Sequence, residues 1–233
     1  MSESHPQIPF SFRVQQSYTF DNFVVGNNQL VIEQIKTLLI AETNGLLYLW
    51  GEQGSGCSHL LQAACQQAGV QRKTAIYLPM SEIRNLDPEM LEGIEGVDLV
   101  CIDHLQAVVG DTAWEEALFH LFNRVLAKQT ALLISGNEPP RGLGVQLPDL
   151  LTRLSSCSVF QLQPLDDDSR LSLLVSRAGD KGMELAPDVA QYILNRSGRC
   201  ASQLLATLDQ LDHSSLSAGR KLTIPFVKES MGW

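Results

Sequence analysis

The sequence has few of the features that mark secreted, metal-binding or membrane proteins. Its five cysteines are scattered, without a Cys-x-x-Cys pair or a cysteine-histidine spacing typical of zinc ligands, so neither a disulfide framework nor a zinc site is predicted. The N-terminus lacks a basic segment followed by an apolar run. No apolar stretch approaches the roughly 18 residues that cross a bilayer. We therefore expect a cytoplasmic protein without a membrane partner.

Positive charge is also scarce. Lysine and arginine number 17 against 26 aspartates and glutamates, which gives a formal net charge of -9. Basic residues gather only in short pairs such as Arg72-Lys73, and a nucleic-acid footprint normally needs clustered cations. Strong direct DNA binding is therefore not expected. With 233 residues, 44% of them hydrophobic, the chain can bury one sizeable core with a small second domain.

Short apolar runs alternate with helical patterns in the first two thirds of the chain. Four nearly continuous runs predict strands buried on both faces, and a fifth, at 159–162, predicts a strand nearer the edge; the four lie at 46–50, 75–78, 99–102 and 131–134. Residues 113–128 carry apolar residues at helical spacing and predict a crossover helix. This alternation predicts an α/β fold with a parallel sheet.

The pattern becomes helical throughout after Pro164. Residues 166–169 are rich in helix N-cap types, and Pro187 suits the first turn of another helix. We therefore predict an extended tail at 1–17, an α/β core at 18–165 and a small all-helical domain at 166–233.

Residues 51–58 form a glycine-rich loop between the first predicted strand and a helical segment, which is the context of a phosphate-binding P-loop. Its glycines would let successive backbone N–H groups face a phosphate, and the hydroxyl of Ser58 would face Mg²⁺. Cys57 stands where the P-loop has its lysine. Two interpretations stay open: a phosphate site without its cation, or a turn that binds nothing.

Several segments resemble the AAA+ core of the bacterial initiator DnaA. Residues 18–28, the glycine-rich loop, 99–103 and 132–140 follow in that family's order and spacing, and the resemblance covers about residues 18–228. DnaA carries a further helix-turn-helix domain, and we expect this chain to end before one. It is therefore similar to the shorter DnaA paralogues that regulate replication.

The resemblance implies a P-loop AAA+ parallel-sheet core with a C-terminal helical lid that binds ADP or another nucleoside diphosphate together with Mg²⁺. Ser58 and Asp103 would serve the Mg²⁺. The implied nucleotide-binding residues are Phe23, Val24, Val25, Gly51, Gly54, Ser55, Gly56, Cys57, Ser58, His59, Asp103, Asn137 and Ser202.

Parts of the hydrolytic apparatus are replaced. Asp103 matches the Walker B carboxylate, but His104 follows it where an active ATPase has an acid. Together with Cys57, this change predicts little or no hydrolysis by the chain itself, so we do not expect an enzyme.

Two further positions belong to the nucleotide sensors of the family. Asn137 falls on sensor 1, where an amide orients water or phosphate. Ser202 falls where sensor 2 has an arginine, and the duty of that arginine could have moved to Arg196 or Arg199.

Arg153 matches the family's arginine finger, which faces the nucleotide of a neighbouring subunit. The resemblance thus implies a negative regulator of chromosomal replication initiation that stimulates hydrolysis of DnaA-bound ATP in trans. An outward finger also implies contact between subunits, so a homo-oligomer is a further possibility. The residues alone favour a solvated or ion-paired surface arginine at this position, and the resemblance favours the finger.

The tail contains a candidate peptide for the sliding clamp, the beta subunit of DNA polymerase III. Its glutamine-led, hydrophobe-ended segment resembles clamp-binding peptides and consists of Gln7, Ile8, Pro9, Phe10, Ser11 and Phe12. A proline-stiffened segment with two phenylalanine anchors loses little entropy on binding. A plain disordered tail is the alternative.

Three other functions remain open. An adaptor could tether a replication partner to the clamp or DNA without promoting hydrolysis. The chain could instead be a weak ATPase of its own. A pseudo-NTPase scaffold would bind no nucleotide at all.

Overall fold

The computed structural model describes residues 18–40, 45–198 and 200–233, so the clamp-binding candidate at 7–12 and Arg199 lie outside the described residues. A five-stranded parallel sheet has the order β2-β3-β4-β1-β5. The strands are β1 (Leu46–Trp50), β2 (Ala75–Pro79), β3 (Leu99–Asp103), β4 (Ala131–Gly136) and β5 (Ser158–Gln161). The predicted parallel α/β fold is confirmed, and β5 lies at the edge.

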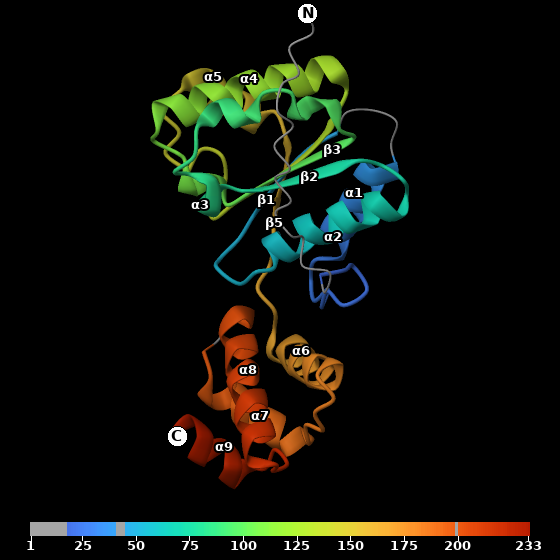
Figure 1. The fold of residues 1–233 in the computed structure, drawn as a ribbon, viewed down its shortest axis with the longest axis vertical. Helices are drawn as coiled ribbons and strands as arrows, with labels where there is room; N and C mark the ends of the chain where they lie inside the picture. The colour runs from blue at the N-terminus through green and yellow to red at the C-terminus, as the bar shows by residue number, and fades with distance from the viewer. Residues whose placement is uncertain (1–17, 41–44, 199) are drawn as a thin grey trace, which may run out of the picture.

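Helices cover both faces of the sheet (Figure 1). Helices α1 (Gln29–Ile40) and α2 (Cys57–Val70) pack on one face, and α4 (Thr112–Lys128) and α5 (Pro148–Ser155) lie on the other. The remaining core helices are short: α3 (Met80–Ile83) and three 3₁₀ turns at Pro88–Leu91, Ile94–Gly96 and Leu105–Ala107. Because helices cover both faces, the inner strands need apolar residues on both sides, which explains their continuous runs.

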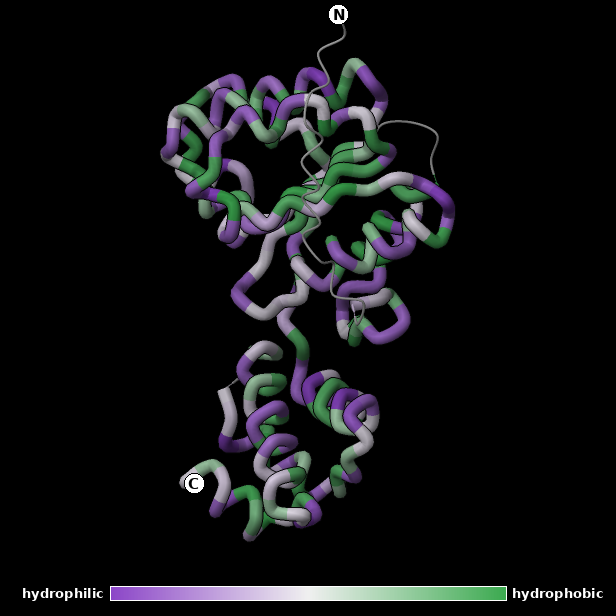
Figure 2. The backbone as a smooth tube through the Cα atoms, in the orientation of Figure 1, coloured by the Kyte–Doolittle hydropathy of each residue, from purple (hydrophilic) through white to green (hydrophobic). Residues whose placement is uncertain are grey.

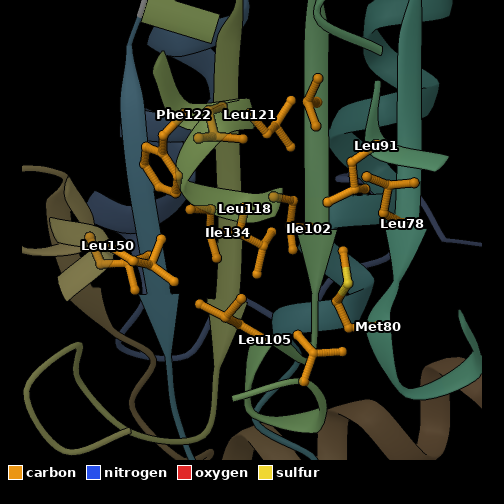
Figure 3. Packing of buried hydrophobic residues seen from close by; sticks show 14 of the residues in the cluster. Leu78, Met80, Leu91, Ile102, Leu105, Leu118, Leu121, Phe122, Ile134 and Leu150 are labelled. Atoms are coloured by element: carbon orange, nitrogen blue, oxygen red, sulfur yellow. The ribbon is translucent and has the colours of Figure 1, made fainter. Parts of the chain in front are cut away.

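The apolar side chains that recur at helical spacing along α4 pack directly on the sheet. Leu118, Leu121 and Phe122 of α4 point toward Ile102 of β3 and Ile134 of β4 (Figure 3), and each is at most 1% exposed. Burying such a side chain contributes about 1.5–3 kcal/mol. Figure 2, coloured by residue hydropathy, shows hydrophobic residues concentrated in the strands.

The C-terminal part is a separate helical unit connected to β5 (Figure 1). It consists of α6 (Asp167–Asp180), α7 (Pro187–Arg196), α8 (Ala201–Ala218) and α9 (Ile224–Met231). Asp166 caps α6 by accepting a hydrogen bond from the Ser169 N–H at 2.8 Å. Leu174, Ile193 and Phe226 join three of these helices in one buried cluster. No described helix is long and apolar enough to cross a membrane.

Candidate functional site

A cavity of about 560 Å³ lies at the carboxyl ends of β1, β3 and β4 and is closed on one side by the lid. Ligand sites of parallel α/β sheets form at this edge because the connecting loops diverge there. Residues 51–59 line it from the core, and Ser202 and Arg177 line it from the lid. Core and lid therefore contribute to one site.

The glycine-rich loop has the backbone of a phosphate cradle. Gly54 and Gly56 take positive φ values of 82° and 102°, which other residues adopt only with strain. Gly56 is the N-cap of α2 and provides no side-chain cap, so the first N–H groups of that helix are directed at the cavity without a side-chain partner. Such N–H groups attract an anion.

Cys57 cannot replace the P-loop lysine as a cation. Burial raises the pKa of its thiol to about 11, and the sulfur lies 3.5 Å from the Ser55 hydroxyl. The side chain is therefore neutral at physiological pH. The cradle offers backbone dipoles to an anion but no formal charge.

Ser202 brings the lid against this loop. A Cβ placed on Gly54 would lie 2.9 Å from the Ser202 hydroxyl and 3.4 Å from the Cβ of Cys200. The N-terminus of α8 thus packs directly on the cradle, at the position the sequence assigned to sensor 2. Arg196 does not fill that role, because its guanidinium lies over the Tyr192 ring, 5.6 Å from the centroid, within the lid.

A group of aromatic side chains lines the cavity next to the cradle. His59 stacks on Tyr18 with ring centroids 4.8 Å apart and meets the edge of Phe23 at 5.2 Å, and its Nε2 lies 2.8 Å from the Thr19 carbonyl oxygen. Val24 also lines the cavity, whereas Val25 packs against the core beneath α1 and α2. We call Tyr18, Phe23 and His59 the aromatic group.

His59 makes the stability of this region depend on pH. Burial lowers the pKa of its imidazole, and the positive charge of Arg177 lowers it further. The hydrogen bond with Thr19 raises the pKa but does not outweigh these two effects. The unfolded chain, with an ordinary histidine pKa of about 6.5, binds the proton more readily, so this contribution is complete above about pH 6.5 and is lost as pH falls toward the folded value.

We therefore expect His59→Gln to lose less stability than the unsubstituted protein between pH 7 and pH 5. The slope of the free energy of unfolding against pH should fall by the equivalent of at most one proton, about 1.4 kcal/mol per pH unit. Urea unfolding at several pH values measures it. Parallel curves for the two proteins would refute the assignment.

Asp103 ends β3 in a closed hydrogen-bond network. One carboxylate oxygen accepts from the Ser135 hydroxyl and the His104 N–H, and the other accepts from the Tyr77 hydroxyl at 2.5 Å and faces His104 Nδ1 at 3.1 Å. Burial alone would raise the pKa of Asp103, but the hydrogen bonds from His104, Ser135 and Tyr77 outweigh it and hold the pKa below its ordinary value.

This network bears on the predicted Mg²⁺ site. Asp103 and Ser58 both line the cavity, yet the Asp103 oxygens already have protein donors, and the described residues contain no group of three or more histidine, cysteine or acidic side chains that could hold a metal. The two residues fit Mg²⁺ only as minor partners of an ion whose main ligands are phosphate oxygens, the usual arrangement for this metal. Asn137 is exposed at the cavity wall, beside Gly136.

Arg153 lies elsewhere. It belongs to α5, does not line the cavity, and donates from Nη2 to Asn123 Oδ1 of α4 at 2.9 Å. The side chain is half-buried, so the guanidinium is held on the α4–α5 surface. This placement excludes a direct role for Arg153 at the chain's own cavity.

The sequence interpretation missed several residues that line the cavity. Tyr18 and Arg177 are the most consequential, and Gln106 adds a buried side-chain oxygen with no hydrogen-bond partner among the described residues. Tyr18 could have been found from its place in the segment that resembles DnaA. Arg177 had no such signal, since the lid packing alone brings it to the site.

These features define a P-loop AAA+ module: the sheet order, the loop after β1, the carboxylate at the end of β3 and the helical lid. The chain belongs to the bacterial DnaA ATPase domain family, whose family model matches residues 14–159. Residues 167–231 match the Hda lid domain, which makes the chain an Hda-like DnaA paralogue.

Solved structures agree on the fold. Domain III of the replication initiation protein DnaA from Thermotoga maritima is 22% identical, with a TM-score of 0.84 over 94% of this chain and 98% of that one. AMPPCP-bound DnaA from Aquifex aeolicus is 23% identical, with a TM-score of 0.72 over 88% of this chain and 68% of that one. The Thermotoga maritima RuvB branch migration motor is 14% identical, with a TM-score of 0.71 over 94% of this chain and 73% of that one.

Proposed function

We propose that this chain is a nucleotide-gated negative regulator of replication initiation that stimulates hydrolysis of DnaA-bound ATP through Arg153. One observation carries the proposal: the chain's own cavity has a phosphate cradle without a cation, while Arg153 lies on a different surface. A site of this kind can retain a nucleotide but stabilises little of the charge that develops during phosphoryl transfer. An outward guanidinium can supply that charge to a partner.

The proposed ligand is ADP or another nucleoside diphosphate, with Mg²⁺ bound mainly through its phosphates. The DnaA structure from Aquifex aeolicus holds AMPPCP, a nucleotide analogue, and that likeness supports a nucleotide in this cavity. Because lining residues come from both core and lid, a bound nucleotide would contact both and set the angle between them. The nucleotide is thus a structural ligand, and the chain's own hydrolysis is weak or absent.

DnaA and the sliding clamp are the proposed partners. The match to the DnaA family and to the Hda lid supports a role in DnaA control. The clamp would be bound by the segment Gln7–Phe12, whose two phenylalanines suit an apolar pocket. Tethering at the clamp would raise the effective concentration of the regulator toward a DnaA molecule held on the same DNA.

Two measurements test this function. Calorimetry with ADP, ATP and CDP, each with and without Mg²⁺, should show tight diphosphate binding without turnover. Single-turnover hydrolysis of ATP held by DnaA should accelerate when the chain and the DNA-loaded clamp are both present. Absence of acceleration despite tight ADP binding would favour the adaptor that tethers a partner without promoting hydrolysis. Absence of both would leave a pseudo-NTPase scaffold.

The cradle itself provides a further prediction. In Gly56→Ala, the new Cβ would lie 2.7 Å from Phe23 Cε2 at a φ of 102°, so the loop or the Phe23 ring must shift. With a strain of about 1–2 kcal/mol added to the clash, we expect the Kd for ADP to rise tenfold or more. Gly144→Ala is the matched control: its φ is also positive, at 80°, but nothing lies within 4 Å of the added atom. Equal ADP binding by both variants in calorimetry would contradict the cradle.

A further inference from the structure

Arg177 is the only arginine or lysine among the described residues that line the cavity. The P-loop position holds neutral Cys57, the sensor 2 position holds Ser202, and Arg196 lies over Tyr192. The described acidic lining residues are Glu52 and Asp103. Within the described part of the lining, Arg177 is thus the one side chain that carries a permanent positive charge.

The contacts that Arg177 makes with described residues leave part of its donor capacity unused. Its side chain is only 14% exposed, and its hydrogen bonds are long: Nη2 donates to the Asn22 carbonyl at 3.4 Å and Nη1 to Asp180 Oδ2 at 3.3 Å. Strong N–H···O bonds lie between 2.7 and 3.2 Å, and an arginine has five N–H donors. A largely desolvated cation with such weak partners is expected to gain from a better acceptor in the cavity.

The position of Arg177 indicates which part of a bound nucleotide, the base or the phosphates, would accept its hydrogen bonds. Ser202 covers the phosphate cradle at Gly54, whereas Arg177 approaches from the side of Asn22, beside the aromatic group. Asn22, which Arg177 contacts, is followed in the chain by Phe23 of the aromatic group, and Phe23 in turn meets His59. Leu173, one turn earlier on α6, lines the same wall. Flat aromatic rings and an aliphatic side chain suit the apolar faces of a nucleobase, and a planar guanidinium can stack on such a group or donate to its edge.

We propose that Arg177 is the residue with which the lid recognises the nucleobase, by donating to acceptor atoms on the edge of the base. Since Arg177 also contacts the Asn22 carbonyl of the core, the base and the core share one lid side chain. The base, in addition to the phosphates, therefore holds the lid against the core. This inference rests on the proposed nucleotide binding and adds base recognition to it.

The test compares three probes: ADP, adenosine and inorganic pyrophosphate. Calorimetry on Arg177→Gln should show the Kd for ADP and for adenosine rising by the same factor, about tenfold, with pyrophosphate unchanged. Arg177→Lys keeps the charge without the planar fork and should show most of that loss. Arg170→Gln is the matched control on the same helix, since Arg170 pairs with Asp167 and does not line the cavity; it should bind all three probes normally.

Other outcomes overturn the proposal in distinguishable ways. Weaker pyrophosphate and ADP binding with unchanged adenosine would mean that Arg177 acts on the phosphates. Unchanged binding of every probe would leave it a structural contact. If Arg177→Gln unfolds at a lower temperature, Arg177→Lys decides, and equal binding by that variant and the unsubstituted protein refutes the inference. No ADP binding by the unsubstituted protein would instead refute the proposed function as well.

Discussion

Replacing Arg153 with alanine is expected to lower the maximal stimulation of DnaA ATP hydrolysis by about 10³-fold, the lower end of the range for arginine fingers in GTPases. The guanidinium is held by Asn123 on the α4–α5 surface, away from the chain's own cavity. The Kd of the variant for ADP should therefore stay within about twofold of the original, a change of less than 0.5 kcal/mol. Single-turnover hydrolysis of DnaA-bound ATP in the presence of clamp and DNA measures the first quantity, and calorimetry the second.

Two variants frame this result. Arg153→Lys keeps the charge but loses the planar fork, so its stimulation should be nearly as low. Arg72→Ala removes an exposed arginine just beyond α2 and should stimulate normally. If Arg153→Ala stimulated hydrolysis as well as Arg72→Ala, Arg153 would be an ordinary surface cation and the adaptor function would gain support.

Replacing Glu115 with alanine is expected to lower the free energy of unfolding by about 3 kcal/mol. Its carboxylate is 1% exposed and accepts hydrogen bonds from the Gly110, Gln146 and Leu147 N–H groups at 2.7–3.1 Å. A hydrogen bond to a charged group contributes about 1.5–3 kcal/mol. Water can partly replace the carboxylate at the exposed Gly110 and Gln146, so the loss is smaller than the full sum.

The same substitution should reduce stimulation of DnaA without weakening ADP binding. Leu147 is the N-cap of α5, so loosening its anchor reaches Arg153 through that helix. Urea unfolding gives the stability change, and Glu116→Ala provides the control, because that neighbouring glutamate is exposed and should change stability by less than about 0.5 kcal/mol. Similar unfolding curves for the two variants would show that water satisfies the freed N–H groups.

Structural features that depend on residues close together in the chain could be predicted from the sequence. The inner strands could be read from continuous apolar runs because helices bury both faces of the sheet. The α4 helix followed from its apolar period, and the glycine-rich loop from its place between a strand and a helix. Helices α1, α3, α5 and α9 were missed. Two of these, α5 and α9, have only 8 residues each, too short for a clear period.

The residues of the candidate site also fall into those that the sequence could predict and those that it could not. The phosphate cradle, Asp103 and Asn137 were predictable because each lies at the carboxyl end of a strand, and these ends of parallel strands meet at one edge. Arg177 was not, because its contact with Asn22 joins residues 155 positions apart. The same holds for the anchoring of α5 by Glu115, which reaches 32 positions along the chain to Leu147.

The sequence by itself determined the parallel α/β core, the helical lid, the glycine-rich loop and the loss of its lysine, because periodicity and local backbone demands are properties of short segments. Only the tertiary structure decided which cation lines the cavity and that Arg153 lies on another surface. It also decided that Asp103 accepts hydrogen bonds from Tyr77, Ser135 and His104. These outcomes depend on how the lid and the helices pack on the sheet, and packing joins residues whose separation in the chain carries no local signal.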